Sequence, residues 1–218
     1  MHNTFRTFGQ AMGLQLVRGI LPHSIDTYLN AAIIEKCRSI LYNTVGNSIK
    51  IGVLPQSTPI SPINSLRTLY NTEEIDASFE NVTDPFQLDI NLDNVMIYTN
   101  FYIKYENSDK YVHCRFIEPD KLAETLIDYC TTATKNEPII TLSNQNEKFT
   151  ANIFTGKNTE KITNIKINYI KNPAIVKYDV SGSNNIDCDL PEYLHNEIVE
   201  LAVKKYNISI GQNIENKT

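Results

Sequence analysis

The stretch NIDCDLPEYLHNEIVELAVKKYNISI, residues 185–210, decides the fold, because it contains the most strongly marked helix of the chain. Asp189 is placed as the cap, and Pro191 falls in the first turn, where its missing N–H costs nothing. Glu192 follows Asp189 at the spacing D-x-x-E, which is that of a capping box. The sequence therefore predicts a helix over 189–206 that starts at Asp189.

The apolar side of this helix is unusually wide. At roughly 100° per residue its apolar positions span about 200°, and these positions are Leu194, Ile198, Val199, Leu201, Ala202, Val203 and Tyr206. A surface helix needs about half of that arc, so we expect cover on two sides, from the same fold or from a neighbouring chain. His195 falls inside the arc, and we expect it to be a structural histidine with a local partner.

The N-terminal part of the chain predicts two more helices. Residues 4–18 have roughly the spacing of a short amphipathic helix, and residues 23–46 fit the i, i+3, i+4, i+7, i+8 template more closely. The apolar positions of the second helix are Ile25, Tyr28, Leu29, Ala32, Ile33, Cys37, Ile40 and Leu41. Residues 1–48 are therefore expected to form a helical hairpin that packs with the C-terminal helix.

The middle of the chain, residues 49–180, reads as β-rich. A short strand near 49–55 is followed by a long excursion in which Pro55, Pro59 and Pro62 exclude a continuous helix. Alternating apolar runs on both sides of ENSD (106–109) predict a β-hairpin. Three further strands are expected in PIITLSN (138–144), KFTANIFT (148–155) and KITNIKINYIKNPAIVKYDV (161–180).

One helix interrupts this β-rich region near 119–134. Asp120 is its candidate cap, and Leu122, Leu126, Ile127 and Cys130 form its expected core side. The acidic segments EEIDASFENVTD (73–84) and DINLDN (89–94) are expected to be solvated loops, since neither matches a calcium-binding loop.

The predicted fold class is α+β, with helices from both chain ends forming a bundle around a β-rich middle insertion. The expected parts are the hairpin at 1–48, the insertion at 49–180, and the C-terminal bundle helix with a short tail at 181–218.

Composition excludes several classes of protein. A net charge of −5 over 218 residues argues against a broad basic surface for nucleic acid or for an anionic membrane. No run reaches the ~18 apolar residues of a membrane span, and the N-terminus lacks the apolar core of a signal peptide. Four scattered cysteines, Cys37, Cys114, Cys130 and Cys188, are therefore expected to be reduced thiols in a protein made in cytoplasm.

No motif for catalysis, a cofactor or a metal is present. The chain lacks GxGxxG, GxxxxGK[ST], GxSxG and HExxH. His113 and Cys114 are adjacent on a predicted strand and so face opposite sides, while Cys188 and His195 have no recognised zinc spacing. We therefore expect no catalytic residue, no cofactor site and no metal site.

Two segments resemble a known family. LPHSIDTYLNAAIIEKC (21–37) and INYIKNPAIVKYDVSGSNNIDCDLPEYLHNEIVELAVKKY (167–206) are similar to head–tail connector or adaptor ring proteins of short-tailed, crAss-like phages. The shared patterns are ID-x-x-LN-x-A in an early helix, a late strand ending in a basic residue and a proline, and DLP-x-x-x-H-x-x-[IL]-V-x-x-A. In this chain the first pattern begins at Ile25, the second lies within Tyr169 to Pro173, and the third runs from Asp189 to Ala202.

The resemblance implies a non-enzymatic virion protein made in the host bacterium's cytoplasm. It implies a cyclic homo-oligomer, a dodecamer, in the neck, where it joins the portal to the tail and genomic double-stranded DNA passes without specific contact. The implied partners are further copies of the chain, the portal protein and neighbouring neck or tail rings, and no membrane. The alternatives are a tail-completion or stopper protein, a small phage-encoded enzyme using His113 or His195, and a host-factor-binding protein.

Overall fold

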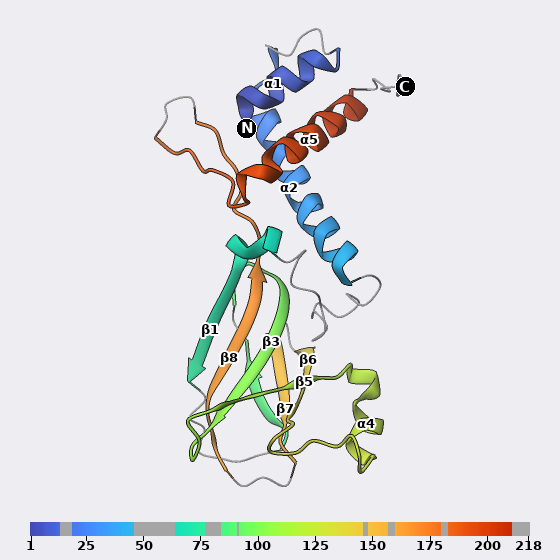
Figure 1. Ribbon diagram of the computed structural model, residues 1–218, viewed down its shortest axis with the longest axis vertical. Coiled ribbons are helices and arrows are strands. Elements are labelled where there is room, and N and C mark those ends of the chain that lie inside the picture. Colours follow the sequence, from blue (N-terminus) through green and yellow to red (C-terminus); the bar gives the residue numbers. More distant parts are fainter. Residues whose placement is uncertain are drawn as a thin grey trace. The chain divides into compact units, whose positions relative to one another are not determined.

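The computed structural model describes residues 1–13, 19–45, 64–76, 84–90, 92–145, 148–156, 160–179 and 183–210. The chain divides into two compact units (Figure 1). The helical unit comprises Met1–Gly46, Pro59–Leu69 and Asn172–Thr218, and the sandwich unit comprises Asn47–Thr58 and Tyr70–Lys171. Helices from both ends and a β-rich middle confirm the predicted α+β class.

Among its described residues, the helical unit has three α-helices and two short 3-10 turns. The helices are α1 (His2–Ala11), α2 (Pro22–Val45) and α5 (His195–Ser209), and the turns are η3 (Asn64–Leu69) and η4 (Glu192–Leu194). The helix expected at 4–18 begins two residues earlier and ends at Ala11. Leu14, Leu16 and Val17, which were part of that expectation, lie outside the described residues.

Helix α5 packs against both α1 and α2. Tyr206 of α5 meets the edges of two aromatic rings, Phe5 of α1 at 6.2 Å and Tyr28 of α2 at 5.3 Å between ring centroids. Its wide apolar arc is buried as expected at Leu194, Ile198, Val199, Ala202 and Val203, whereas Leu201 and Tyr206 are half-buried. Two-sided cover of α5 is thus provided within the chain's own bundle.

The predicted capping box at Asp189 is wrong. The chain first makes the 3-10 turn η4, whose N-cap is Pro191, and α5 starts only at His195 with Leu194 as its N-cap. Neither N-cap residue makes a side-chain cap hydrogen bond. The Asp189 carboxylate instead accepts a hydrogen bond from the backbone N–H of Ala174, at 3.3 Å. A tertiary contact thus replaces the local cap.

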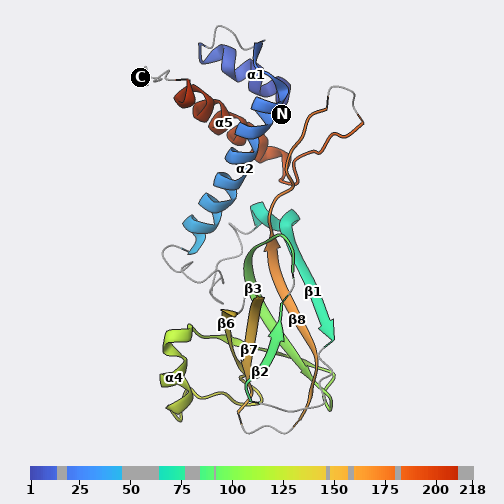
Figure 2. The same ribbon diagram turned by 180° about the vertical axis from the view of Figure 1, so that it is seen from behind.

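The sandwich unit consists of two four-stranded sheets, shown from two sides in Figures 1 and 2. One sheet has the order β1-β8-β3-β4 and is antiparallel throughout, and the other has the order β2-β7-β6-β5, in which only the β5–β6 pair is parallel. The strands are β1 (Tyr70–Asp76), β2 (Phe86–Asp89), β3 (Val95–Tyr105), β4 (Tyr111–His113), β5 (Arg115–Phe116), β6 (Ile139–Gln145), β7 (Lys148–Phe154) and β8 (Ile162–Lys171).

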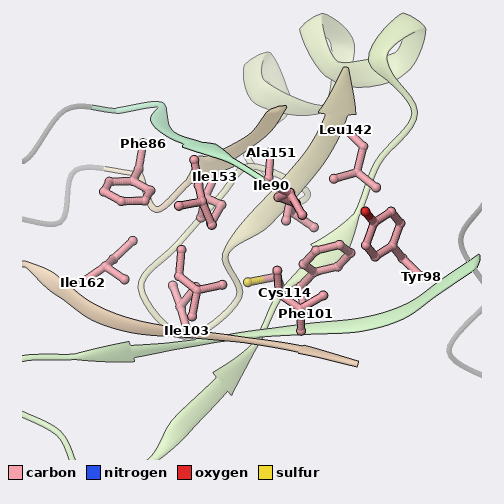
Figure 3. Packing of buried hydrophobic residues seen from close by; sticks show 14 of the residues in the cluster. Phe86, Ile90, Tyr98, Phe101, Ile103, Cys114, Leu142, Ala151, Ile153 and Ile162 are labelled. Carbon is pink, nitrogen blue, oxygen red and sulfur yellow. The ribbon is translucent and has the colours of Figure 1, made fainter. Parts of the chain in front are cut away.

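The core of the sandwich unit lies between its two sheets (Figure 3). Ile103 of β3 faces Ile153 of β7, Phe101 lies beside Tyr98, and Cys114 lies between Ile103 and Phe101. The alternation of apolar and polar residues along the strands explains this arrangement, because successive side chains point to opposite faces. The side chains of this cluster are hydrophobic, so their removal from water stabilises the unit.

The predicted strands are confirmed in most places. The hairpin around ENSD pairs Tyr102 with His113 and Lys104 with Tyr111. The last predicted strand ends at Lys171, because the next residue but one is Pro173, which has no N–H for a ladder. The short strand expected near 49–55 and Pro55, Pro59 and Pro62 lie outside the described residues.

The acidic segment from Glu73 is not simply a loop. Residues up to Asp76 belong to the edge strand β1, which pairs along its whole length with β8. Glu74 lies opposite Lys166, and Asp76 accepts a hydrogen bond from Asn164 at 2.8 Å. Carboxylates are well suited to an edge strand, because charge there discourages pairing with other chains.

The helix expected near 119–134 is shorter and less buried than predicted. Helix α4 spans Pro119–Ile127 with Glu118, not Asp120, at its N-cap. None of its residues is fully buried: Leu122 and Leu126 are half-buried, while Ile127 and the nearby Cys130 are exposed. The helix stops at Asp128, where side-chain hydrogen bonds offer the backbone an alternative to further helix.

Among the described residues, no helix is long and apolar enough to cross a membrane. Helix α2 is long enough, but it carries Asp26, Glu35, Lys36 and Arg38 within its span.

Candidate functional site

Helix α2, the segment 172–179 and the stretch just before η4 meet at one place in the helical unit. Their meeting point is the extended segment 172–179 that follows β8. Asn30 of α2 donates through Nδ2 to the carbonyl oxygen of Val176 (2.9 Å) and accepts through Oδ1 from the N–H of Val176 (2.7 Å). Asp189 accepts from the N–H of Ala174. Side chains from residues 30 and 189 thus fix the same short stretch of main chain.

A third anchor lies one helical turn before Asn30. The Asp26 carboxylate accepts through Oδ2 from the N–H of Tyr178 at 3.2 Å, and its Oδ1 lies 2.7 Å from Nε2 of His2. The His2 ring stacks on the ring of Tyr178 with 4.7 Å between centroids. The side chains of His2 and Asp26 are 12% and 10% exposed, so their mutual contact satisfies polar atoms that water reaches poorly.

These anchors hold a segment that presents apolar side chains to solvent. Lys177 and Ile186 exchange two backbone hydrogen bonds, so 172–179 and 183–190 run side by side (orange in Figures 1 and 2). Ile175 is 73% exposed, and Tyr178 and Ile186 are also exposed. We call these three residues the apolar strip. Exposed apolar side chains mark interaction sites where they form a contiguous patch.

His195, weighed above as structural or catalytic, has the expected local partner. Its Nε2 lies 3.0 Å from the carbonyl oxygen of Leu190, in the DLP segment that precedes η4. The histidine therefore ties the start of α5 to the chain that enters it.

His113 lies on the outer side of the sheet β1-β8-β3-β4. Its Nε2 is 3.2 Å from Oδ1 of Asn100, and its ring meets the edge of the Tyr102 ring at 5.1 Å between centroids. Burial lowers the pKa of His113 from its ordinary value. Cys114 belongs to the core on the other side of the sheet, which confirms that these two residues face opposite ways.

The four cysteines are unpaired and lie in different environments. Cys37 and Cys114 are buried, Cys188 is half-buried and Cys130 is exposed. Burial, and secondarily the neighbouring Cys188 thiol, raises the pKa of Cys37 to about 12. Across the described ranges there is no group of three or more His, Cys, Asp and Glu residues that could hold a metal ion.

The anchoring role of Asp26 and Asn30 was missed by sequence reasoning, although a signal for it exists. Residues four apart share a face of a helix, so these two polar side chains are neighbours beside the apolar stripe of α2. Two polar groups at that spacing indicate a polar partner. Sequence alone could not identify it, because Val176 and Tyr178 lie about 150 residues away.

No protein-family model and no curated protein matches this chain.

Proposed function

We propose that this chain is a structural component of the neck of a short-tailed phage virion, where copies form a ring between the portal and the tail. One observation carries the proposal. Asp26, Asn30 and Asp189, three polar residues of the patterns that carry the resemblance, all bind main chain of the same segment, 172–179. These three side chains are used up in hydrogen bonds inside the fold, where they hold in place the segment whose apolar side chains are exposed. That use of polar side chains suits an assembly protein.

In this proposal the apolar strip contacts the neighbouring subunit. A ring requires a heterologous contact, in which one surface of each subunit meets a different surface of the next and rotation closes the circle. Ile175, Tyr178 and Ile186 supply apolar area on an already ordered segment, so little conformational freedom is lost when the contact forms. We propose twelve copies in the ring, as the sequence resemblance implies.

The charge of the chain fits a channel for DNA. A net charge of −5 per subunit disfavours tight binding to phosphates, so DNA would slide through the ring without adhering. The same charge opposes ring closure by the isolated protein. We therefore propose that the portal or an earlier ring acts as the template, and that the chain alone is a monomer or a small oligomer.

The proposal is tested on purified virions and on the purified chain. Quantitative mass spectrometry of virions should find this chain at a copy number equal to that of the portal, and images of the neck should place it there. Light scattering of the chain alone, then with purified neck components, should show assembly only in the mixture. Absence of the chain from virions, with DNA ejection unaffected by its deletion, would contradict the proposal.

A second experiment separates the structural function from the enzymatic alternative. His113→Gln and His195→Gln retain hydrogen-bonding side chains at the two positions. Both variants should enter virions at the wild-type copy number and give infectious particles. If either variant assembled normally yet abolished infection, a chemical role for that histidine would replace the structural one.

A further inference from the structure

The turn after α4 presents two very exposed apolar side chains. Ile127 is 86% exposed and Tyr129 is 94% exposed, more than any other large apolar side chain in the described parts of the chain. Single exposed apolar residues are common, whereas exposed apolar side chains that lie together mark interaction sites, and these two residues are only two positions apart in the chain. We call Ile127 and Tyr129 together the apolar knob.

The knob stands on an ordered turn. The Asp128 carboxylate accepts from the N–H of Cys130 (3.1 Å) and from the hydroxyl of Thr131 (2.7 Å). The hydroxyl of Thr132 donates to the carbonyl oxygen of Leu126 (3.2 Å), and its N–H donates to the carbonyl oxygen of Asp128 (2.9 Å). These bonds satisfy the main chain on both sides of Tyr129, so the turn holds the knob in one place.

The turn is also fixed to the sandwich. Arg115 of β5 donates through Nη2 to the carbonyl oxygen of Thr131, and Tyr105 of β3 donates its hydroxyl to the carbonyl oxygen of Lys135 (3.0 Å). Gly156, with φ of +71°, lets the carbonyl of Ala133 approach so closely that any Cβ there would clash. A rigidly mounted pair of apolar side chains loses little entropy on binding.

Acidic residues border the knob. At roughly 100° per residue, Asp120 and Glu124 lie on the same face of α4 as Ile127, while Leu122 and Leu126 lie on the half-buried side. Lys121 is the single basic residue of α4, and it pairs with Glu118 at 3.6 Å. The border of the knob is therefore acidic, which favours a partner surface of positive charge.

We propose that the knob is a docking site for a different protein, one with an apolar pocket bordered by Lys or Arg. A second copy of this chain is the less suitable partner, because each copy carries a net charge of −5 and would bring like charge to an acidic surface. The docking site rests on the geometry of residues 105–156 and on the net charge, whereas its experiment uses the phage infection that the neck proposal implies.

The experiment places a photo-reactive side chain in the knob. The full chain carrying Tyr129→p-benzoylphenylalanine is expressed during infection, irradiated, and its adducts are identified by mass spectrometry. We expect one major adduct with a different protein, at a peptide containing both apolar and basic residues. Ile127→Ser should reduce the adduct at least about fivefold, and so should Asp120→Asn combined with Glu124→Gln. Ile208→Ser, which changes an exposed residue of α5, is the matched control and should leave the yield unchanged.

The outcomes separate the two proposals. A self-adduct, no adduct, or an adduct insensitive to the loss of Asp120 and Glu124 charge would overturn the docking site. Presence of the chain in virions without an adduct would overturn the docking site alone. A charge-dependent adduct with a protein outside the virion, with the chain itself absent from virions, would support the docking site and overturn the neck proposal. Unchanged thermal melting of each variant excludes misfolding as the cause, because all the altered side chains are exposed.

Discussion

Asn30 binds both backbone polar groups of Val176, donating to its carbonyl and accepting from its N–H, across 146 positions of sequence. An amide side chain is suited to this, since it has a donor and an acceptor at the spacing of a peptide group. The two hydrogen bonds resemble those that a neighbouring β-strand would make to Val176, but here they come from the side chain of a helix residue. It explains how the chain that leaves β8 is fixed to α2.

Asn30→Leu should destabilise the helical unit by about 2–4 kcal/mol, because it leaves two partly buried backbone groups of Val176 unpaired. Urea unfolding followed by circular dichroism measures this. Asn196→Leu, at an exposed position of α5, is the control and should change stability by less than about 0.5 kcal/mol. Equal effects of the two substitutions would mean that the pair with Val176 contributes nothing.

Ile198→Ala should cost about 2–5 kcal/mol, because its side chain is fully buried between the helices and its removal leaves a cavity. Leu201→Ala, on the same helix but half-buried, should cost clearly less. Denaturant titration of the two variants gives the comparison. The order would be reversed if α5 were covered mainly on the Leu201 side, for example by a partner chain.

Asn207→Leu should stabilise the protein by about 1–2 kcal/mol. Asn207 is 1% exposed, and both polar atoms of its amide lack a hydrogen-bond partner among the described residues. Leucine has a similar volume and no polar atom to desolvate. A lower melting temperature for the variant would show that the amide is satisfied after all, for instance by an internal water molecule.

His113 should make stability depend on pH. Its pKa in the folded protein lies below the ordinary value of 6.5 because of burial, so the unfolded chain binds this proton more readily. The stabilising contribution is complete above that ordinary value and is lost as the pH falls through it towards the folded-state pKa. Melting curves between about pH 8 and about pH 5 should show a weaker pH dependence for His113→Gln than for the wild type. If the melting temperature of His113→Gln depended on pH as strongly as that of the wild type, other titrating groups would be responsible for the dependence.

The four thiols should react in a fixed order. Cys130 is exposed and should be alkylated first. Cys37 and Cys114 are buried with raised pKa values, so they form little thiolate and should react only after unfolding. Without reductant, the denatured protein should yield all four thiols. Mass spectrometry after timed alkylation gives the order, and a missing thiol in the denatured sample would indicate a disulfide.

The elements with strong periodicity could be predicted from the sequence alone. The apolar arc of α5, the apolar stripe of α2 and the alternation along β3 and β8 are local patterns, and each fixes which face is buried before any partner is known. The hairpin around ENSD followed in the same way, since its two strands are neighbours in sequence.

Where the polar side chains bind, and which apolar side chains stay exposed, depends on tertiary contacts. Glu73 to Asp76 form a strand because β8, about 90 residues later, offers an edge to pair with. Asp189 leaves its expected cap position because Ala174 presents an N–H nearby. Ile127 is exposed because α4 ends at it and packs by the opposite side. In the first two cases the deciding partner lies outside the local segment, so the free energy that selects the conformation is absent from the local pattern.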